Sequence, residues 1–254
     1  MARRIRPALS KKRPRSVFLR SPESQYHREV FLSPFPFLRS HHKRFSVGLF
    51  TKEDFSVSNE EIGQLLKANG VAALSQVHGN KAVIVREPVA RTVEADALAT
   101  DMPGLALTIR TADCQSFLVF APEKNIIGLI HAGWKGLQAG IISSFFDLLW
   151  EEWGIRAEET IVAAGPSLCK VHGEFTDPKT ELKGINPRFF EGRLVDLRTI
   201  AEDQLFAVGV DPGRFERHPD CTQCHPEKYW TYRGGHREEV IAGSTNVLAC
   251  VLLP

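Results

Sequence analysis

Four short apolar runs constrain the fold of this chain more than any other feature of its sequence. They are bounded by glycine, proline or polar residues and cover 105–109, 117–120, 125–130 and 161–164. Because they lack the polar–apolar alternation of a half-exposed strand, they predict strands that are buried on both faces. Amphipathic helices are predicted at 137–153 and 197–208. Strands interleaved with helices in this way predict a single α/β or α+β domain.

Turn and capping signals set the remaining elements. Ser58, followed by acidic residues, predicts the N-cap of a helix that ends by Gly70. The stretch 72–85 predicts two paired strands, with His78-Gly79-Asn80 as the turn between them. The apolar end of the chain, 247–253, predicts a buried strand.

The length and composition fit one globular domain without a membrane segment. The chain has 254 residues, of which 43% are hydrophobic and 24% charged, and this suffices for one large core. No apolar run approaches the ~20 residues that a membrane-spanning helix needs. We therefore expect no membrane partner, and we expect a monomer for a chain of this size.

The basic residues are concentrated at the N-terminus. The chain carries 32 Lys and Arg against 30 Asp and Glu, but residues 1–20 hold eight of the basic residues and no acidic one. The remainder therefore has a net charge of −6, which argues against nucleic acid as a partner. Residues 1–28 lack the apolar segment of a secretory signal. We expect a basic, disordered extension there, with a transit peptide or nucleic-acid arm as alternatives, before a catalytic domain at 29–254.

Three separate turn-rich motifs contain residue types that bind metal ions. They are Gln76-Val77-His78-Gly79, Thr111-Ala112-Asp113-Cys114 and His131-Ala132-Gly133-Trp134-Lys135-Gly136. His78, Cys114 and His131 would together suit Zn²⁺ or copper, and three protein ligands leave a fourth position open for catalysis. Their separations match no local zinc-finger spacing, so only the fold could bring them together.

His131 stands where α/β proteins usually bind ligands. It follows the apolar run 125–130 and precedes a glycine-rich turn and a helix, and ligands bind at the carboxyl ends of such strands. Gly133 and Gly136 allow a close approach of the backbone to a ligand. The start of the helix and Lys135 could contact an anion.

The cysteines indicate a reducing compartment and one further candidate site. Five cysteines do not form a disulfide framework, and the cytoplasm is the expected location. Cys221 and Cys224 form a CxxC pair, for which a structural zinc would need two more ligands; His218 and Cys250 are the candidates, both poorly spaced. We interpret this stretch instead as a loop that brings Arg233 and Arg237 to the site.

Taken together, the motifs resemble one family of proteins. It is the bacterial family variously labelled multicopper polyphenol oxidase (laccase), peptidoglycan editing factor and purine nucleoside phosphorylase. The resemblance rests on the three motifs above and on Asp96-Ala97-Leu98-Ala99-Thr100, Ala164-Gly165-Pro166-Ser167 and the segment from Cys221-Thr222 to Tyr232-Arg233. Six motifs in the family's order, spread over 29–254, are highly specific.

The resemblance implies a fold, a metal and an activity. The fold is a single layered α/β/β/α domain with mixed sheets. The metal is zinc, held by His78, Cys114 and His131, which would also be catalytic; the laccase label implies copper, although copper oxidases need more His and Cys ligands. The activity is that of a purine nucleoside phosphorylase that also deaminates adenosine. Its substrates would be adenosine, inosine, guanosine, methylthioadenosine and phosphate.

The phosphate contacts are where this sequence departs from the family. Lys52 stands where an arginine is usual, which keeps the charge but loses bidentate anion binding. We expect the substrate and phosphate to be bound by Lys52, Lys135, Arg233 and Arg237. Asp113, beside Cys114, is expected to orient a ligand or a backbone group.

The same three residues also fit a cysteine hydrolase. Cys114 would be the nucleophile, His131 its base, and His78 or Asp113 the orienting group. The label peptidoglycan editing factor implies this chemistry, the cleavage of an amide in a cell-wall precursor. The sequence does not separate this alternative from the zinc enzyme, and the copper polyphenol oxidase is a third hypothesis.

Overall fold

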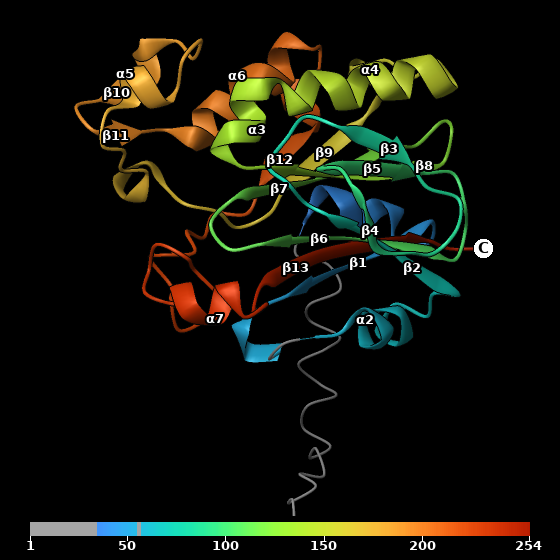
Figure 1. Ribbon diagram of the computed structural model, residues 1–254. Helices are drawn as coiled ribbons and strands as arrows, with labels where there is room; N and C mark the ends of the chain where they lie inside the picture. The colour runs from blue at the N-terminus through green and yellow to red at the C-terminus, as the bar shows by residue number, and fades with distance from the viewer. Residues whose placement is uncertain (1–34, 55–56) are drawn as a thin grey trace, which may run out of the picture.

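Two stacked β-sheets, covered by helices on both outer faces, form the protein (Figure 1). The computed structural model describes residues 35–54 and 57–254. The expected N-terminal extension at 1–28 and the first residues of the expected catalytic domain lie outside the described residues. None of the helices within these ranges is long and apolar enough to cross a bilayer.

The first sheet has five strands and mixes parallel with antiparallel pairs. Its centre is antiparallel, since β13 pairs in that sense with both β1 and β6, whereas β2 pairs parallel with β6 and β4. In spatial order the strands are β1 (Phe45–Phe50), β13 (Asn246–Leu252), β6 (Leu105–Thr111), β2 (Gly70–Ser75) and β4 (Val89–Glu94). The C-terminal strand expected at 247–253 is therefore confirmed, and it is buried throughout.

The second sheet has six strands and is also mixed. The pairs β9–β7, β7–β8 and β8–β5 are antiparallel, and the pairs at the two edges are parallel. In spatial order the strands are β12 (Phe215–Arg217), β9 (Ile161–Ala164), β7 (Gln115–Ala121), β8 (Ile126–Ala132), β5 (Ala97–Thr100) and β3 (Ala82–Ile84). Every residue of β7 and β8 is buried, as the unbroken apolar runs predict.

Helices cover the outer faces of the two sheets. Among the described residues, three helices lie over the six-stranded sheet and one lies below the five-stranded sheet, and several short elements lie at one end of the molecule (Figure 1). The covering helices are α3 (Trp134–Ala139), α4 (Ile141–Trp153), α6 (Leu197–Ala207) and, on the other side, α2 (Asn59–Leu65). The short elements at that end of the molecule include α5 (Pro178–Glu181), β10 (Phe190–Glu191), β11 (Leu194–Val195) and α7 (Arg237–Ile241). Two further short elements are η2 (Lys52–Asp54) and η4 (Lys170–His172).

Three apolar clusters fill the three spaces between these four layers. Along β7 the side chains alternate: Phe117 and Val119 pack toward the helices, while Leu118 and Phe120 pack toward the other sheet. On the far side of the five-stranded sheet, Ile62 of α2 packs against strand residues in a third cluster. Burial of one such side chain stabilises the fold by about 1.5–3 kcal/mol. The layered α/β/β/α architecture with mixed sheets, implied by the resemblance, is confirmed.

The predicted hairpin over 72–85 is wrong. β2 and β3 belong to different sheets, so His78 lies in a connection that crosses from one sheet to the other. Gln76 fixes the start of this connection, because its side-chain amide exchanges two hydrogen bonds with the backbone of Arg110, at 2.8 and 2.9 Å. A turn signal between two apolar runs does not specify that the runs pair with each other.

The helix predicted at 137–153 is two helices. It starts earlier than expected, at Trp134, and is interrupted at Gly140, whose φ of 81° is left-handed and ends α3 before α4 begins. The Ser58 prediction is confirmed: its side chain accepts the backbone N–H of Glu61, whose carboxylate accepts the backbone N–H of Ser58 in return.

Candidate functional site

The crossing connection and the two central strands of the six-stranded sheet bring His78, Cys114 and His131 together. Cys114 lies in the turn just before β7, and the β7–β8 register places the start of β7 beside His131. One donor atom from each of the three side chains lies within 4.8 Å of the others. The Cys114 Sγ atom is 3.8 Å from His78 Nε2. We call these three residues the pocket cluster.

Asp96, just before β5, holds two members of the pocket cluster in place. Its carboxylate accepts the His131 Nδ1 proton at 2.8 Å, and both side chains are almost fully buried, at 0% and 3% exposed. It also accepts the backbone N–H groups of His78 at 2.9 Å and Gly79 at 2.7 Å. Since Nδ1 of His131 is thus used, its Nε2 is the nitrogen left for a metal or a substrate.

Sequence reasoning missed this role of Asp96. The residue is the first of the Asp96-Ala97-Leu98-Ala99-Thr100 motif, which contributed to the resemblance, but no role was predicted for it. Asp96 and His131 are 35 residues apart in the chain, and only the tertiary structure brings their side chains into contact. Asp113, which was expected to orient a ligand or a backbone group, holds a backbone group: its carboxylate accepts the Thr222 hydroxyl and the Arg233 backbone N–H, both at 2.7 Å. Asp113 therefore orients the 222–233 loop and not a histidine.

The hydrogen bonds within the pocket cluster shift the pKa values of its members. Burial by itself would raise the pKa of the Cys114 thiol, but hydrogen bonds with His131 and His78 outweigh it and bring the pKa to about 6. Burial would likewise lower the pKa of His131, but Asp96 and Cys114 raise it to about 9. Without a metal, Cys114 is therefore a thiolate and His131 an imidazolium at neutral pH, and each charge stabilises the other.

Glycine is required next to the pocket cluster. A methyl group added at Gly133 would lie 2.8 Å from His78 Cδ2, closer than real side chains come, and 3.0 Å from Cys114 Sγ, which is a tight contact. Gly133 also precedes α3 as its N-cap residue. The backbone therefore approaches the cluster as closely as the sequence predicts, and any other residue would displace the two ligands.

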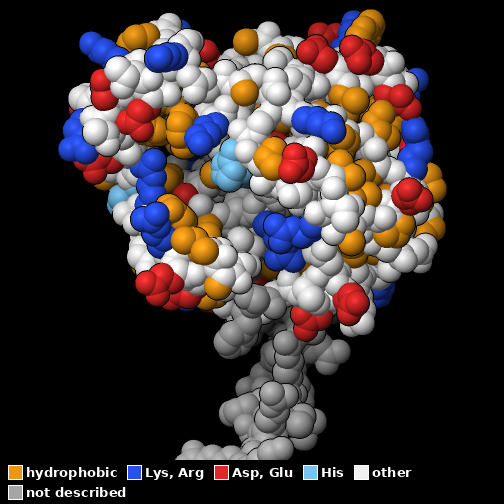
Figure 2. Space-filling view, in the orientation of Figure 1, with side chains coloured by type: hydrophobic (Ala, Val, Ile, Leu, Met, Phe, Trp, Pro, Cys, Tyr) orange, Lys and Arg blue, Asp and Glu red, His pale blue; other side chains and the backbone are white. Residues whose placement is uncertain are grey.

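The pocket cluster opens into a cavity of about 550 Å³, a size within the usual range for small-molecule sites. Figure 2 shows the face of the molecule hollowed, with a histidine at the edge of the hollow and Lys and Arg side chains on either side of it. The cavity is lined by His78, Cys114 and His131, by the aromatic rings of Trp134 and Tyr232, and by the cationic side chains of Arg91, Arg110 and Arg233.

Of the four cations expected to bind substrate, only Arg233 lines this cavity. The Lys52 ammonium instead donates to the Pro226 carbonyl at 3.1 Å and lies over the Trp230 ring. Lys135 lies over the Trp134 ring, and Arg237 lies over the Tyr232 ring. Arg91 and Arg110 line the cavity but were not singled out from the sequence, because nothing in their local pattern distinguishes them from other surface cations.

The CxxC pair also has partners that differ from those expected. Cys221 and Cys224 lie beside Cys169 and His172, and all four donor atoms are within 4.8 Å of one another. The expected partners lie elsewhere: the His218 ring faces Tyr229, and Cys250 lies in the core between the sheets. We call these four residues the surface cluster. The cysteines of this stretch therefore belong to a possible metal site of their own, in addition to the loop's role of bringing Arg233 to the cavity.

The comparison with known families agrees with this architecture. Residues 43–249 match the family described as multi-copper polyphenol oxidoreductase laccase. The chain belongs to this family. The suspected resemblance is thus confirmed, and the His/Cys groups found in the structure could hold a metal ion.

Relatives of this chain in the family are named as phosphorylases. A purine nucleoside phosphorylase of Rickettsia prowazekii (strain Madrid E) is 30% identical over 227 residues, which cover 84% of this chain and 92% of the relative. Another, from Pseudomonas aeruginosa, is 32% identical over 180 residues, covering 65% of this chain and 69% of the relative. These names suggest that the protein is an enzyme.

Solved structures share the fold. YlmD from Geobacillus stearothermophilus superposes with a TM-score of 0.70 at 21% identity and covers 83% of this chain and 92% of its own. The hypothetical protein YfiH from Bacillus licheniformis superposes with a TM-score of 0.71 at 18% identity, over 83% and 93% of the two chains. At such identities the likeness concerns the fold alone.

Proposed function

We propose that this protein is a zinc-dependent purine nucleoside phosphorylase that also deaminates adenosine. One observation carries the proposal: two imidazoles and a thiol converge at the floor of a cavity lined by arginines and aromatic rings. The names of the relatives supply the substrate class, purine nucleosides. Adenosine, inosine, guanosine and methylthioadenosine are the candidates that the family resemblance implies. The free thiols of all five cysteines support a reducing compartment such as the cytoplasm.

The donor set of the pocket cluster fits zinc. Two neutral imidazoles and one thiolate form a catalytic zinc site that leaves one position for water or substrate. The buried carboxylate of Asp96 fixes the His131 tautomer so that Nε2 faces the cluster, as carboxylates behind metal-binding histidines do. A bound Zn²⁺ would act as a Lewis acid and make a water molecule nucleophilic near neutral pH. Copper, as the laccase label implies, is the alternative ion.

The residues of the cavity can hold both substrates of a phosphorolysis. In this reaction a phosphate oxygen forms a bond to C1′ of the ribose while the bond from C1′ to the purine nitrogen breaks. Arg91, Arg110 and Arg233 are the cationic side chains lining the cavity, and they would bind the phosphate. Trp134 and Tyr232 offer faces for the purine ring. In deamination, water adds to C6 of adenine and ammonia leaves, so the purine must turn toward the pocket cluster.

Phosphate dependence separates the two activities in one experiment. Purified protein is analysed for metal content and then given adenosine with and without phosphate, before and after treatment with a chelator. We expect adenine to form only when phosphate is present, inosine to form without it, and both to vanish with chelator and return with zinc. Adenosine that stays unchanged in the metal-loaded protein would overturn the proposal. The exposed His225, outside both clusters, supplies a matched His→Ala control for the His78→Ala variant.

A cysteine hydrolase is the second candidate, and one observation favours it. Cys114, His131 and Asp96 follow one another as a thiol, an imidazole and an orienting carboxylate. In this candidate Asp96 takes the orienting role that was expected of His78 or Asp113. Activity on a cell-wall peptide amide that survives chelation but is lost on alkylation of Cys114 would favour the hydrolase.

A further inference from the structure

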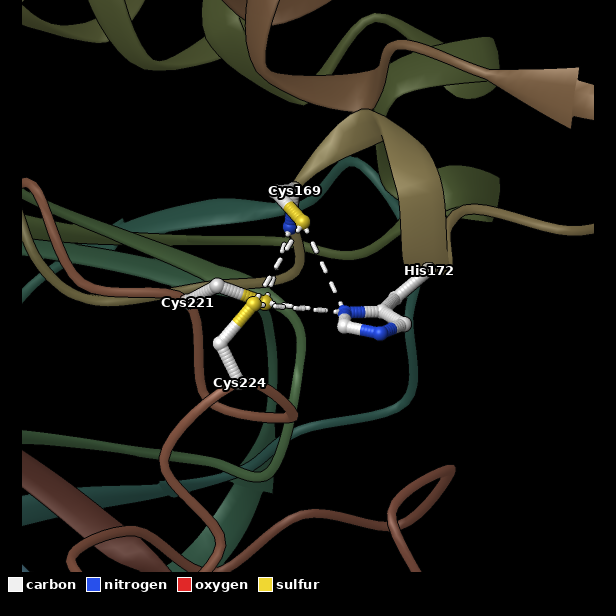
Figure 3. A group of neighbouring side chains, drawn as sticks. All are labelled: Cys169, His172, Cys221 and Cys224. Atoms are coloured by element: carbon white, nitrogen blue, oxygen red, sulfur yellow. Dashed lines mark hydrogen bonds between the residues drawn. The ribbon is translucent and has the colours of Figure 1, made fainter.

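Outside the pocket cluster, three thiols and one imidazole converge at the surface of the protein. Cys169 and His172 come from η4 and the residue before it, whereas Cys221 and Cys224 come from a loop about 50 residues further along the chain. Figure 3 shows all four side chains pointing toward one another. Cys221 is buried, Cys169 and His172 are half-buried, and Cys224 is exposed.

The distances in this surface cluster are those of a tetrahedral site. With Zn–S of about 2.3 Å and Zn–N of about 2.0–2.1 Å, a tetrahedron places sulfur and nitrogen about 3.5 Å apart and two sulfurs about 3.8 Å apart. The His172 Nδ1 atom is 3.5 Å from Cys169 Sγ, 3.4 Å from Cys221 Sγ and 3.6 Å from Cys224 Sγ. The two sulfurs of Cys169 and Cys224 are 3.9 Å apart.

We propose that Cys169, His172, Cys221 and Cys224 bind a second Zn²⁺ ion, separate from the pocket cluster and structural in role. Four protein ligands complete the coordination of zinc and leave no open position, which is the property of a structural site. Thiolate-rich ligand sets select zinc or other soft ions over magnesium or calcium. The backbone N–H of Cys169 donates to Cys221 Sγ at 3.2 Å, as expected for a sulfur that carries negative charge.

A disulfide does not explain this arrangement. Bonded sulfurs are about 2.05 Å apart, well below the 3.9 Å between Cys169 and Cys224. A disulfide would also use two of the three thiols and give no role to the imidazole. His172 lies within 3.6 Å of all three sulfurs, which places it as a fourth ligand and not as a bystander.

The ion would fasten together two loops that line the cavity. Leu168, next to Cys169, lines the cavity, and so do Tyr232 and Arg233 in the loop that follows Cys224. The Arg233 guanidinium donates to the His172 carbonyl at 3.2 Å, and its backbone N–H donates to Asp113 beside the catalytic cysteine candidate. A metal at the surface cluster would therefore set the position of the cavity wall without touching the substrate.

Arg198 already ties the same two loops by hydrogen bonds. Its guanidinium donates to the carbonyls of Ser167 at 2.6 Å and Asp220 at 2.5 Å, which precede Cys169 and Cys221 in the two loops. The Thr222 backbone N–H also donates to the Ser167 carbonyl. These hydrogen bonds fix the two loops relative to each other, so the four ligands are already in place before a metal binds.

The metal content of single-cysteine variants tests the proposal. We expect the full-length wild-type protein, purified with zinc and dialysed, to contain one zinc equivalent more than Cys224→Ser. Cys250→Ala, which removes a core cysteine distant from both clusters, should keep the wild-type content. Equal zinc in wild type and Cys224→Ser would overturn the proposal, and so would a mass spectrum showing a disulfide between Cys169 and Cys224 in the freshly purified protein.

Two further measurements keep the result specific. Cys224→His replaces one zinc ligand with another and should contain the zinc equivalent that Cys224→Ser lacks. If Cys224→Ser lost zinc only because the loop had misfolded, Cys224→His would lose it as well. In cobalt-loaded protein, the sulfur-to-cobalt charge-transfer absorption should fall in Cys224→Ser and should persist in Cys114→Ser. Zinc that is present in Cys114→Ser but absent from Cys224→Ser would support the surface site even if the zinc enzyme proposed for the pocket cluster proved wrong.

Discussion

Two groups of histidine and cysteine side chains lie near the same loops of this protein, one with three donors and one with four. The pocket cluster sits at the ends of central strands, is backed by the buried Asp96, and opens into the cavity. The surface cluster joins two loops, and its four donors would complete the coordination of a zinc ion. If both proposals hold, the same residue types serve chemistry where a ligand position stays open and serve architecture where it is closed.

Removing one ligand from each cluster should give the largest difference in activity between the two. We expect His78→Ala to lower phosphorolysis by more than ~10³-fold, because a lost catalytic metal removes about 4 kcal/mol or more of transition-state stabilisation. Cys224→Ser should stay within about tenfold of wild type, because the surface cluster does not touch substrate. Steady-state kinetics on both variants, with His225→Ala as control, measures this. Equal losses in the two variants would erase the distinction between the clusters.

The next largest effect concerns the carboxylate behind the pocket cluster. We expect Asp96→Asn to weaken zinc binding or activity by about 10–100-fold, since the loss of a group that hydrogen-bonds to a metal ligand has effects of that size. Asp113→Asn should leave zinc affinity unchanged, because Asp113 orients the 222–233 loop instead. Competition with a chromophoric chelator gives the two affinities. A normal affinity in Asp96→Asn would mean that His131 needs no carboxylate to hold it.

A matched pair of glycines tests how tightly the backbone encloses the pocket cluster. Gly133→Ala would place a methyl group 2.8 Å from His78, whereas a methyl group at Gly79 would meet no atom closer than 3.6 Å. We expect Gly133→Ala to lower zinc affinity at the pocket cluster roughly tenfold, about 1.4 kcal/mol, and Gly79→Ala to leave it near wild type. The surface cluster should keep its metal in both variants. Zinc titration of each protein measures these affinities, and equal affinity in Gly133→Ala and Gly79→Ala would contradict the prediction.

Alkylation of Cys114 in chelator-treated protein should follow an acidic pKa. Because hydrogen bonds from His131 and His78 bring the pKa to about 6 against the effect of burial, the thiolate forms as the pH rises through 6. The rate should then level off by about pH 7, whereas an ordinary thiol, with a pKa of about 8.5, keeps gaining reactivity up to about pH 9.5. At pH 7 we expect a few-fold faster reaction than a free thiol, because a lower pKa also reduces intrinsic nucleophilicity.

Mass spectrometry of the Cys114 peptide gives this pH profile, and Cys114→Ser identifies the signal. A midpoint near that of a free thiol would show that the two imidazoles do not stabilise the thiolate. Protection of Cys114 by added zinc, without protection of Cys250, would tie the same thiol to the metal.

The smallest effect is expected at Lys52. Its ammonium contacts Pro226, His236 and the Trp230 ring and does not line the cavity. We expect Lys52→Ala to change the KM for phosphate by less than about twofold, and Arg91→Ala, at the cavity, to raise it about tenfold, which corresponds to the loss of one charge-assisted hydrogen bond of ~1.5 kcal/mol. Phosphate saturation curves decide between them. A larger effect at Lys52 would place the phosphate outside this cavity.

Local patterns predicted most strands and helices because burial leaves its mark on consecutive residues. The runs at 117–120 and 125–130 are confirmed as strands buried on both faces, and Ser58 caps its helix through the expected pair with Glu61. The errors arose where distant segments compete for partners. Nothing local in 72–85 shows that β2 and β3 enter different sheets, and only the left-handed φ of Gly140 divides the helix after His131.

The sequence by itself determined the residue types available for chemistry, the strands that carry them and the family to which the chain belongs. Only the tertiary structure decided which of those residues meet. It placed Asp96 behind His131, moved Lys52 away from the cavity, and gave the CxxC pair Cys169 and His172 as partners in place of His218 and Cys250. The physical reason is that local propensity acts over a few residues, whereas a ligand set depends on contacts between segments about 20 to 50 residues apart.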